Sequence, residues 1–411
     1  MATTEFEAVP AVEHAPRTPG LVVMKFGGTS VGDAERLQCV ARRLVAAKEA
    51  GSKVVAVVSA MGRTTDELVE LAHSVSPSPQ ARELDMLLSV GERISCALVA
   101  MAIVDLGHSA ISLTGSQAGI VTDSTHTKAK IVEVRARRIH EALERDEIVL
   151  VAGFQGISAE SLDVTTLGRG GSDTTAVALA AALGADVCEI YTDVLGVYSA
   201  DPRVCPSARK LDRVSFEEML EMASSGAGVM MARSIEIART HTVRLHVRSS
   251  FEGDEGTWIT EEDDPMLEKA LISGVVHQRK ETVYHVGQSE GGAARLFEAL
   301  ADANVNVDTI LQSGPAEIVF SAPPEDRADA ERTLDGLGLD WSARHDLGKV
   351  SVIGAGMKSH PGVAAKTFAT LAHAGIEPVV VSTSPIKIAC HVPAEQVDRA
   401  VQVLHEAFDL G

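Results

Sequence analysis

One glycine-rich turn combines side chains that could bind an anion and hold it for a reaction. The turn is Gly168–Asp173 (GRGGSD), and an Ala-rich segment with helical composition follows it to Ala185. Glycine lets the backbone approach a ligand closely, and the free amides of a first helical turn attract anions. Arg169 suits a carboxylate or a phosphate, whereas Asp173 adds a charge that a simple anion site does not need. We predict a site that acts on a bound anion, with an ordinary loop before a helix as the alternative.

A second glycine turn follows an apolar segment near the start of the chain. Leu21–Phe26 (LVVMKF) has the composition of a buried strand, and Gly27–Ser30 (GGTS) follows it directly. Helical spacing over Asp33–Ala50 completes a strand, a turn and a helix, which is the arrangement of a phosphate cradle. The spacing is neither that of a P-loop nor that of a dinucleotide fingerprint. Lys25 lies inside the apolar strand, where a cation is costly without a partner, so we expect it to be paired.

The elements that must position these turns alternate between strand and helix patterns. Lys53–Ala60, Ile148–Gly153 and Val187–Thr192 are short apolar runs typical of buried strands. Polar residues follow the ends of several of these runs. The pattern predicts an α/β fold, with an open, mostly parallel sheet, helices on both faces and a site at the carboxyl edge.

Two helical patterns lie among these strands. One runs from about Ala81 to Leu106, and another covers Val132–Glu144. The sequence Gly91-Glu92-Arg93 interrupts the apolar face of the first. Glutamate is usually exposed to solvent, so Glu92 is either a surface acid or a carboxylate that binds a substrate ammonium.

Composition narrows the classes of partner and compartment. The chain has 411 residues, enough for two or three domains, of which 45% are hydrophobic and 23% charged, as in globular proteins. A net charge of −20 disfavours nucleic acid and anionic membranes as partners. No apolar run is expected to reach the length of a transmembrane helix. The cysteines are dispersed, without a Cys-x-x-Cys pair, which indicates reduced thiols in a cytoplasmic protein: Cys39, Cys96, Cys188, Cys205 and Cys390.

Composition shifts and an internal repeat divide the chain. We expect a disordered leader over residues 1–19, which lack the features of a signal peptide, a catalytic domain over 20–252 and an acidic linker over 253–270. Beyond the linker, Gly291–Val305 (GGAARLFEALADANV) matches Gly362–Ile376 (GVAAKTFATLAHAGI) at one constant offset. Two modules, 271–345 and 346–411, therefore form either a sensor for a small molecule or a structural or oligomerising appendage.

Two signatures make the chain resemble the aspartate kinases of the amino-acid kinase superfamily. They are KFGGTSVGD at Lys25–Asp33 and TTLGRGGSDTTA at Thr165–Ala176. The resemblance covers about residues 20–411, and GKVSVIGAGMKSHPG at Gly348–Gly362 resembles the second of two ACT modules of the actinobacterial type. It implies an amino-acid kinase domain followed by two βαββαβ ACT modules, and a homo-oligomer formed through these modules.

The same resemblance implies a reaction. ATP would phosphorylate the side-chain carboxylate of L-aspartate to 4-phospho-L-aspartate, with Mg²⁺ bridging the phosphates. A carboxylate with a reference pKa of about 3.9 is already ionised at neutral pH, so no general base is required. Mg²⁺ should keep mostly water and phosphate ligands, and the sequence contains no metal site of its own.

Site residues follow from the resemblance by position. In the catalytic group, Lys25 contacts the transferring phosphate, Asp173 holds Lys25, and Arg169 clamps the α-carboxylate of the substrate. The other substrate-binding residues are Ser59, Thr65, Glu92, which takes the ammonium, and Ser172. The other ATP-binding residues are Gly27, Gly28, Thr29, Ser30, Thr192, Asp193, Tyr198, Asp201 and Arg203.

The chain departs from the family pattern near the nucleotide. Gly228 stands where the family usually has a lysine that reaches the nucleotide. The loss of this cation predicts weaker ATP binding or slower transfer, unless Lys210 or Arg233 compensates. Two alternatives to a working aspartate kinase therefore stay open: a kinase for another acidic amino acid, and a degenerate, non-catalytic regulatory subunit.

The ACT modules depart further. Gln288–Gly291 replaces the usual D-K-P-G turn, and Pro385 follows Ser384 where glutamate is usual. An amino-acid effector needs polar partners, and each polar group left unpaired costs roughly 1–3 kcal/mol. We therefore expect feedback by lysine and threonine to be altered or lost.

Overall fold

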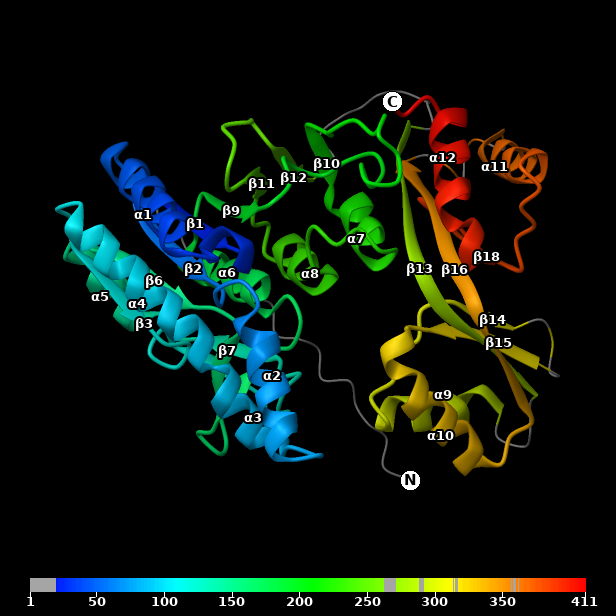
Figure 1. The fold of residues 1–411 in the computed structure, drawn as a ribbon, viewed down its shortest axis with the longest axis horizontal. Helices are drawn as coiled ribbons and strands as arrows, with labels where there is room; N and C mark the ends of the chain where they lie inside the picture. Colours follow the sequence, from blue (N-terminus) through cyan, green and yellow to red (C-terminus); the bar gives the residue numbers. More distant parts are fainter. Residues whose placement is uncertain are drawn as a thin grey trace. The chain divides into compact units, whose positions relative to one another are not determined.

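The computed structural model describes residues 20–261, 271–287, 292–312, 314, 317–355, 357, 360 and 362–411 (Figure 1). The chain forms two compact units. The first contains residues up to Val197, with Asp212–Phe216 and Val229–Asp263, and the second contains the rest. The predicted leader, part of the predicted linker and the predicted turn Gln288–Gly291 lie outside the described residues.

An eight-stranded sheet forms the centre of the first unit. In sheet order its strands are β10 (Arg213–Ser215), β12 (Thr257–Thr260), β11 (Leu245–Ser249), β9 (Val187–Thr192), β1 (Leu21–Phe26), β2 (Lys53–Val58), β6 (Ile148–Ala152) and β3 (Ala110–Leu113). All neighbouring strands are parallel except β11 and β12. The sheet confirms the predicted α/β class, because continuous runs of buried β-branched residues suit parallel strands covered on both faces.

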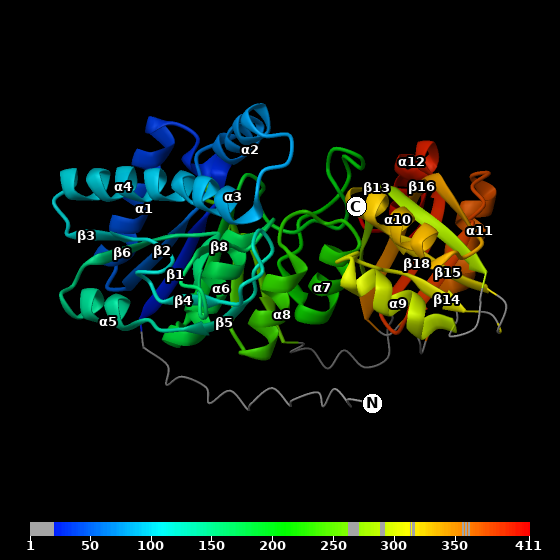
Figure 2. The ribbon, with the colours of Figure 1, turned by 90° about the horizontal axis from the view of Figure 1, so that it is seen from below.

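Helices cover the two faces of this sheet. On one face α1 (Ala34–Glu49) and α4 (Val90–Asp105) pack together over β1, β2 and β6 (Figure 2). On the other face α6 (Gly171–Leu183) contacts β1, β2 and β9, and packs against α8 (Ala232–Thr240). Most of α6 is buried, which explains its Ala-rich composition, since an all-round apolar helix belongs inside a domain.

Some predicted elements are wrong. The predicted helix Val132–Glu144 is strand β5 (Ile131–Val134) followed by helix α5 (Arg137–Glu144). The predicted linker 253–270 contains β12, which pairs with β10 and β11. A small four-stranded sheet that we did not predict joins β5 to β4 (Ile120–Thr122), β7 (Gln155–Ser158) and β8 (Val164–Thr166).

The long helical pattern after Ala81 is two helices, α3 (Ala81–Leu88) and α4, which meet at Ser89. By length and composition Ala81–Asp105 is apolar enough to cross a membrane, so the expectation that no run reaches that length is wrong. Its buried residues Cys96, Val99 and Ile103 belong to the core beneath α1. One face of α4 therefore packs in the core of the domain, whereas Ile94, Leu98 and Met101 are exposed.

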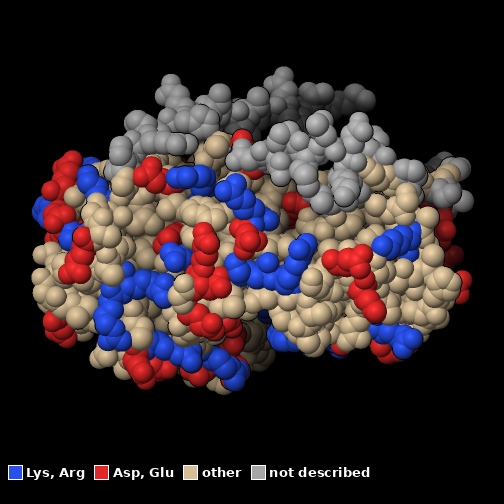
Figure 3. Space-filling model, turned by 90° about the horizontal axis from the view of Figure 1, so that it is seen from above, with Lys and Arg blue, Asp and Glu red and all other residues tan. Residues whose placement is uncertain are grey.

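Although the chain has a net charge of −20, the face drawn in Figure 3 has no large region of only one charge sign. Acidic and basic side chains are interspersed there. All five cysteines are free thiols, of which Cys39 is exposed and the others are buried.

A six-stranded antiparallel sheet forms the second unit. In sheet order its strands are β14 (Ile310–Gln312), β15 (Glu317–Ala322), β13 (Leu271–Gly287), β16 (Trp341–Ala355), β18 (Lys387–Pro393) and β17 (Val380–Ser384). The predicted repeat is confirmed. The succession of α9 (Gly292–Asp302), β14, β15 and α10 (Arg327–Leu337) recurs as α11 (Gly362–His373), β17, β18 and α12 (Val397–Ala407).

The boundaries within this unit differ from those predicted. β13 and β16 pair along most of their length, so the predicted boundary between residues 345 and 346 falls inside β16. Tyr198–Leu211 and Glu217–Gly228, which we expected inside the domain 20–252, also belong to this unit. Helix α7 (Phe216–Ser224) contacts the second repeat of this unit through an ion pair of 2.8 Å between Glu221 Oε2 and Lys387 Nζ.

Candidate active site

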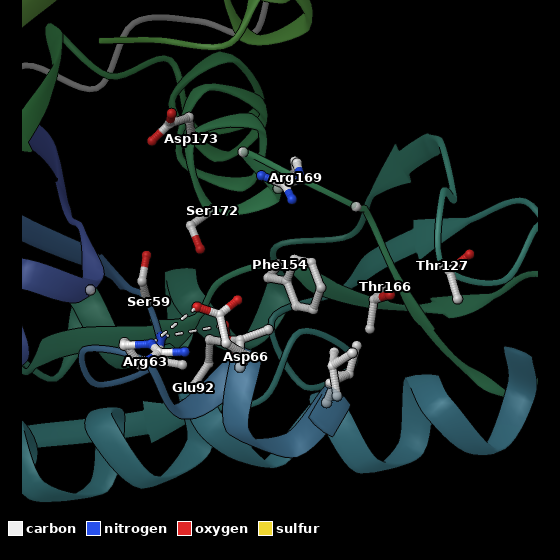
Figure 4. Close-up of a pocket in the computed structure, with 18 of the residues that line it drawn as sticks. Ser59, Arg63, Asp66, Glu92, Thr127, Phe154, Thr166, Arg169, Ser172 and Asp173 are labelled. Atoms are coloured by element: carbon white, nitrogen blue, oxygen red, sulfur yellow. Dashed lines mark hydrogen bonds and ion pairs between the residues drawn. The ribbon is translucent and has the colours of Figure 1, made fainter. Parts of the chain in front are cut away.

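The predicted site residues of the first unit meet at the carboxyl edge of its sheet. A pocket of about 650 Å³ opens there, beside the N-terminus of α6 (Figure 4). The strands β1, β2 and β6 end at this edge because they run parallel. Eight predicted residues line the pocket: Lys25, Gly28, Ser59, Thr65, Glu92, Arg169, Ser172 and Asp173.

Two glycines permit the close approaches that shape the pocket. A Cβ on Gly28 would lie 3.0 Å from the carbonyl oxygen of Ala60, so the turns after β1 and β2 touch through their backbones. Gly170 has a φ of +67°, and a Cβ there would lie 1.7 Å from Cγ of Met231. Larger residues at these positions would push the turns apart.

Lys25 is paired as predicted. Its Nζ lies 2.6 Å from Oδ1 of Asp173, and the two side chains are only 12% and 9% exposed. Lys25 comes from the end of β1, and Asp173 comes from the first turn of α6. The ion pair therefore fixes a cation at the meeting point of the strand end and the helix N-terminus, where negative ligands are favoured.

Glu92 is a buried carboxylate, so the interpretation as a surface acid is wrong. It lies in the first turn of α4 with 3% exposure. The backbone amide of Ala60 donates to Oε1 at 3.3 Å, while the buried Oε2 has no hydrogen-bond partner among the described residues. Burial raises the pKa of Glu92 to about 7. A buried carboxylate oxygen without a partner at the wall of a pocket is suited to accept hydrogen bonds from a ligand cation.

Arg169 brings a positive charge to the pocket. Arg169 is exposed in the glycine turn and forms no ion pair with any residue in the described part of the chain. Ser172 lies in the first turn of α6, where its hydroxyl and the helix amides face an incoming anion. Other charges that line the pocket are paired with one another: Lys25 with Asp173, and Arg63 with Asp66 and Glu70. Glu92 and Arg169 remain as one anionic and one cationic group suited to a zwitterion.

The remaining predicted residues do not line this pocket. Ser30 and Thr192 lie near the ends of β1 and β9, where the Ser30 hydroxyl is 2.6 Å from that of Ser250 and the Thr192 hydroxyl donates to Asp193 at 3.1 Å. Gly27 and Thr29 lie in the same turn as Ser30. Three further residues, Tyr198, Asp201 and Arg203, belong to the second unit. There Arg203 donates to both carboxylate oxygens of Asp201, at 3.0 and 2.8 Å.

Several pocket residues were not predicted. Arg63, Thr127, Phe154 and Thr166 line the pocket, and Thr127 and Phe154 have left-handed φ values of 66° and 67°. Two of these residues could have been found from the sequence. Thr166 lies inside the signature Thr165–Ala176, and Phe154 lies just after the end of β6. Thr127 lies in a loop whose sequence gave no signal.

No group of three or more His, Cys, Asp and Glu side chains that could hold a metal occurs within the described ranges.

Comparisons with known proteins identify the family of this chain. The model of the amino acid kinase family matches residues 20–249, and an ACT domain model matches residues 350–408. An aspartokinase of Mycolicibacterium smegmatis is 54% identical over 407 residues, which cover 95% of this chain and 96% of the relative.

Two solved structures of E. coli aspartokinase III are also similar. The complex with aspartate and ADP matches with a TM-score of 0.84 over 94% of this chain and 99% of that chain, at 24% identity, and supports the fold. The complex with lysine and aspartate matches with a TM-score of 0.71 over 95% and 99%, at 25% identity.

The burial of Glu92 predicts a pH-dependent stability. The pKa of the folded state, about 7, lies above the ordinary value of 4.5, so the folded protein holds a proton that the unfolded chain loses between these values. The free energy of unfolding therefore falls as the pH rises through this window, and the cost persists above it. Glu92→Gln, which carries no charge, should stabilise the protein at pH 8 by on the order of 3 kcal/mol.

Urea unfolding at pH 8 and pH 5 measures this effect. The stabilisation by Glu92→Gln should be much smaller at pH 5, because wild-type Glu92 is mostly protonated in the folded state at this pH. The exposed Glu67→Gln is the matched control and should change the stability by less than about 0.5 kcal/mol at both values. A Glu92→Gln effect of equal size at both pH values would contradict the prediction.

Proposed function

Since the chain belongs to the amino acid kinase family, and within it to the aspartokinases, we propose that it phosphorylates the side-chain carboxylate of L-aspartate with ATP. The products are 4-phospho-L-aspartate and ADP, and the reaction serves amino-acid biosynthesis. The observation that carries the proposal is the unpartnered oxygen of Glu92 in a pocket that Arg169 and Lys25 also line.

The pocket can hold aspartate by its three charged groups. The ammonium of the substrate binds Oε2 of Glu92, which satisfies a buried acceptor. The α-carboxylate binds the Arg169 guanidinium, the Ser172 hydroxyl and the amides that begin α6. The side-chain carboxylate is then directed toward Lys25. Substrate binding needs ionised Glu92, so the affinity for aspartate falls below about pH 7.

Phosphoryl transfer follows from this placement. An oxygen of the side-chain carboxylate attacks the γ-phosphorus of ATP, and the bond between the γ-phosphorus and the bridging oxygen breaks to release ADP. Lys25 stabilises the charge on the transferring group, while Asp173 keeps its Nζ at the strand end. Such catalysis depends on holding two anions in line rather than on a proton transfer.

ATP lies beside the turn Gly27–Ser30, with Thr192 and Asp193 at the neighbouring strand end. The nucleotide-binding roles of Tyr198, Asp201 and Arg203, in the second unit, stay predictions from the family resemblance. Mg²⁺ would be held mainly by the phosphates and by water, and it would supply positive charge to the transferring group.

We also propose the setting of the enzyme. It acts in the cytoplasm, in line with its free thiols, as a homo-oligomer joined through the ACT modules. An amino-acid effector binds at these modules, as the E. coli structure with lysine suggests. We propose no nucleic acid and no membrane as partners.

The proposed activity is tested by aspartate-dependent release of ADP from Mg·ATP, with hydroxylamine to trap the acyl phosphate as aspartate hydroxamate. Wild-type protein should turn over and form the hydroxamate. Arg169→Met should raise the KM for aspartate about a hundredfold, because it removes a charged, two-pronged contact. The exposed Arg137→Met on α5 is the control and should change the KM less than twofold.

Failure of folded wild-type protein to turn over with aspartate would overturn the proposal. Turnover with a different acidic amino acid would identify the first alternative. Absence of turnover with any of them would identify the regulatory subunit.

The glycine at position 228 gives a gain-of-function test. Gly228 is exposed, and a Cβ built there meets no heavy atom within 4 Å, so a larger side chain fits. Gly228→Lys restores the cation of the family pattern, and it should lower the KM for ATP about threefold to tenfold, as expected for about 1 kcal/mol of charge attraction. Gly228→Met, of similar length without the charge, is the control. An equal change in both variants would contradict an electrostatic role.

Altered feedback is a further proposal for the second module. In its β17–β18 hairpin, the Ser384 hydroxyl donates to Oε1 of Glu221 at 3.3 Å, and Lys387 pairs with the same carboxylate. Pro385 lacks a backbone N–H. These groups are thus engaged or missing where an effector needs partners. Lysine and threonine together, in large excess, should inhibit turnover by less than half. Inhibition above nine-tenths would show intact feedback.

A further inference from the structure

A wholly buried carboxylate lies behind the substrate pocket without lining it. Asp85, in α3, has 0% exposure. Its Oδ2 accepts from Nδ1 of His126 at 2.7 Å, both of its oxygens accept from the backbone N–H of Thr127 at 3.1 Å, and Oδ1 accepts from the Thr166 hydroxyl at 2.5 Å. A carboxylate has no proton to donate, so all three partners act as donors to one side chain.

The partners of Asp85 belong to the wall of the pocket. Thr127 and Thr166 both line it. The carbonyl oxygen of Thr127 lies 3.1 Å from the position of a Cβ on Gly168, so Thr127 directly backs the glycine turn. Thr166 lies two residues before that glycine, and its carbonyl oxygen accepts from the N–H of Ala129. Asp85 therefore ties together the loop and the turn from which Arg169 projects.

Two residues with strained backbone conformations line this pocket. Thr127 has a φ of 66°, a left-handed conformation that a β-branched residue rarely adopts. The N–H of Thr127 is the group that Asp85 binds through both oxygens. Strained residues persist where the surroundings hold them, and they concentrate at functional sites. Phe154, on the same pocket, is a second left-handed residue.

We propose that Asp85 is a positioning residue for aspartate binding: its buried carboxylate holds Thr127 and Thr166 so that the Gly168–Arg169 turn presents the guanidinium to the α-carboxylate of the substrate. Asp85 itself contacts neither substrate. The proposal rests on the proposed function, and it assigns Asp85 to the aspartate side of the reaction because the residues that it holds line the aspartate pocket.

The test compares steady-state constants of the full-length protein for both substrates. Asp85→Asn replaces an acceptor oxygen by an NH₂ group that cannot accept, so at least one of the three donors loses its partner. The variant should raise the KM for aspartate about tenfold to a hundredfold, because a hydrogen bond to a charged group is lost at the wall of the aspartate pocket. The KM for ATP should stay within twofold.

Two further variants keep the test decisive if Asp85→Asn folds poorly. Thr166→Val removes one donor and should raise the KM for aspartate in the same selective way, whereas Thr166→Ser keeps the hydroxyl and should restore most of the affinity. The matched control is Asp163→Asn. Its carboxylate accepts from Nε of Arg82 in α3 at 3.0 Å on the surface, which links the same helix to the start of β8 without touching the pocket.

The outcomes separate the two proposals. Wild-type protein that lacks aspartate-dependent turnover would overturn the proposed function. Active wild type, with an unchanged KM for aspartate in Asp85→Asn and Thr166→Val, would overturn the positioning role. Parallel changes in both KM values together with a lower melting temperature would also overturn it, since they indicate a purely structural role.

Discussion

A lysine in a buried strand requires a counter-ion, and this requirement organises the first unit. Asp173 supplies the charge from the first turn of α6, at 2.6 Å from Nζ of Lys25. The helix must therefore begin against the end of β1, and the glycine turn before the helix must pass close to the strand edge. Arg169 lies in this turn and Ser172 in the first turn of α6, so the ion pair that satisfies Lys25 also fixes where these two side chains line the pocket.

A few side chains at the pocket, and not the net charge of the chain, determine which ligands the pocket attracts. With a net charge of −20, the protein does not attract anions at long range. The attraction for a phosphate or a carboxylate comes from Lys25, Arg169 and helix amides within one pocket. Glu92 adds a buried carboxylate, and its desolvation raises its pKa to about 7. The proposed recognition of a zwitterion requires such opposite charges within one pocket.

Much of the fold and part of the site could be predicted from sequence because the signals are local. β1 and β9 have the predicted bounds, since each is a continuous apolar run. The glycine turns placed Lys25, Arg169 and Asp173 correctly at one pocket. Thr127 gave no signal, because its left-handed backbone depends on a carboxylate in a distant helix. The burial of Glu92 likewise depends on how α4 packs, which spacing alone does not reveal.

The long strands β13 and β16 limit where the second unit can be truncated. Residues 271–278 in β13 pair with the part of β16 that belongs to the second repeat, while the rest of β13 pairs with β15 of the first. A fragment that starts at residue 346 would expose one side of β16 along its whole length. Such an unpaired edge invites association with other chains. The two repeats therefore share one sheet, and we expect fragments that keep both to fold better than fragments that keep one.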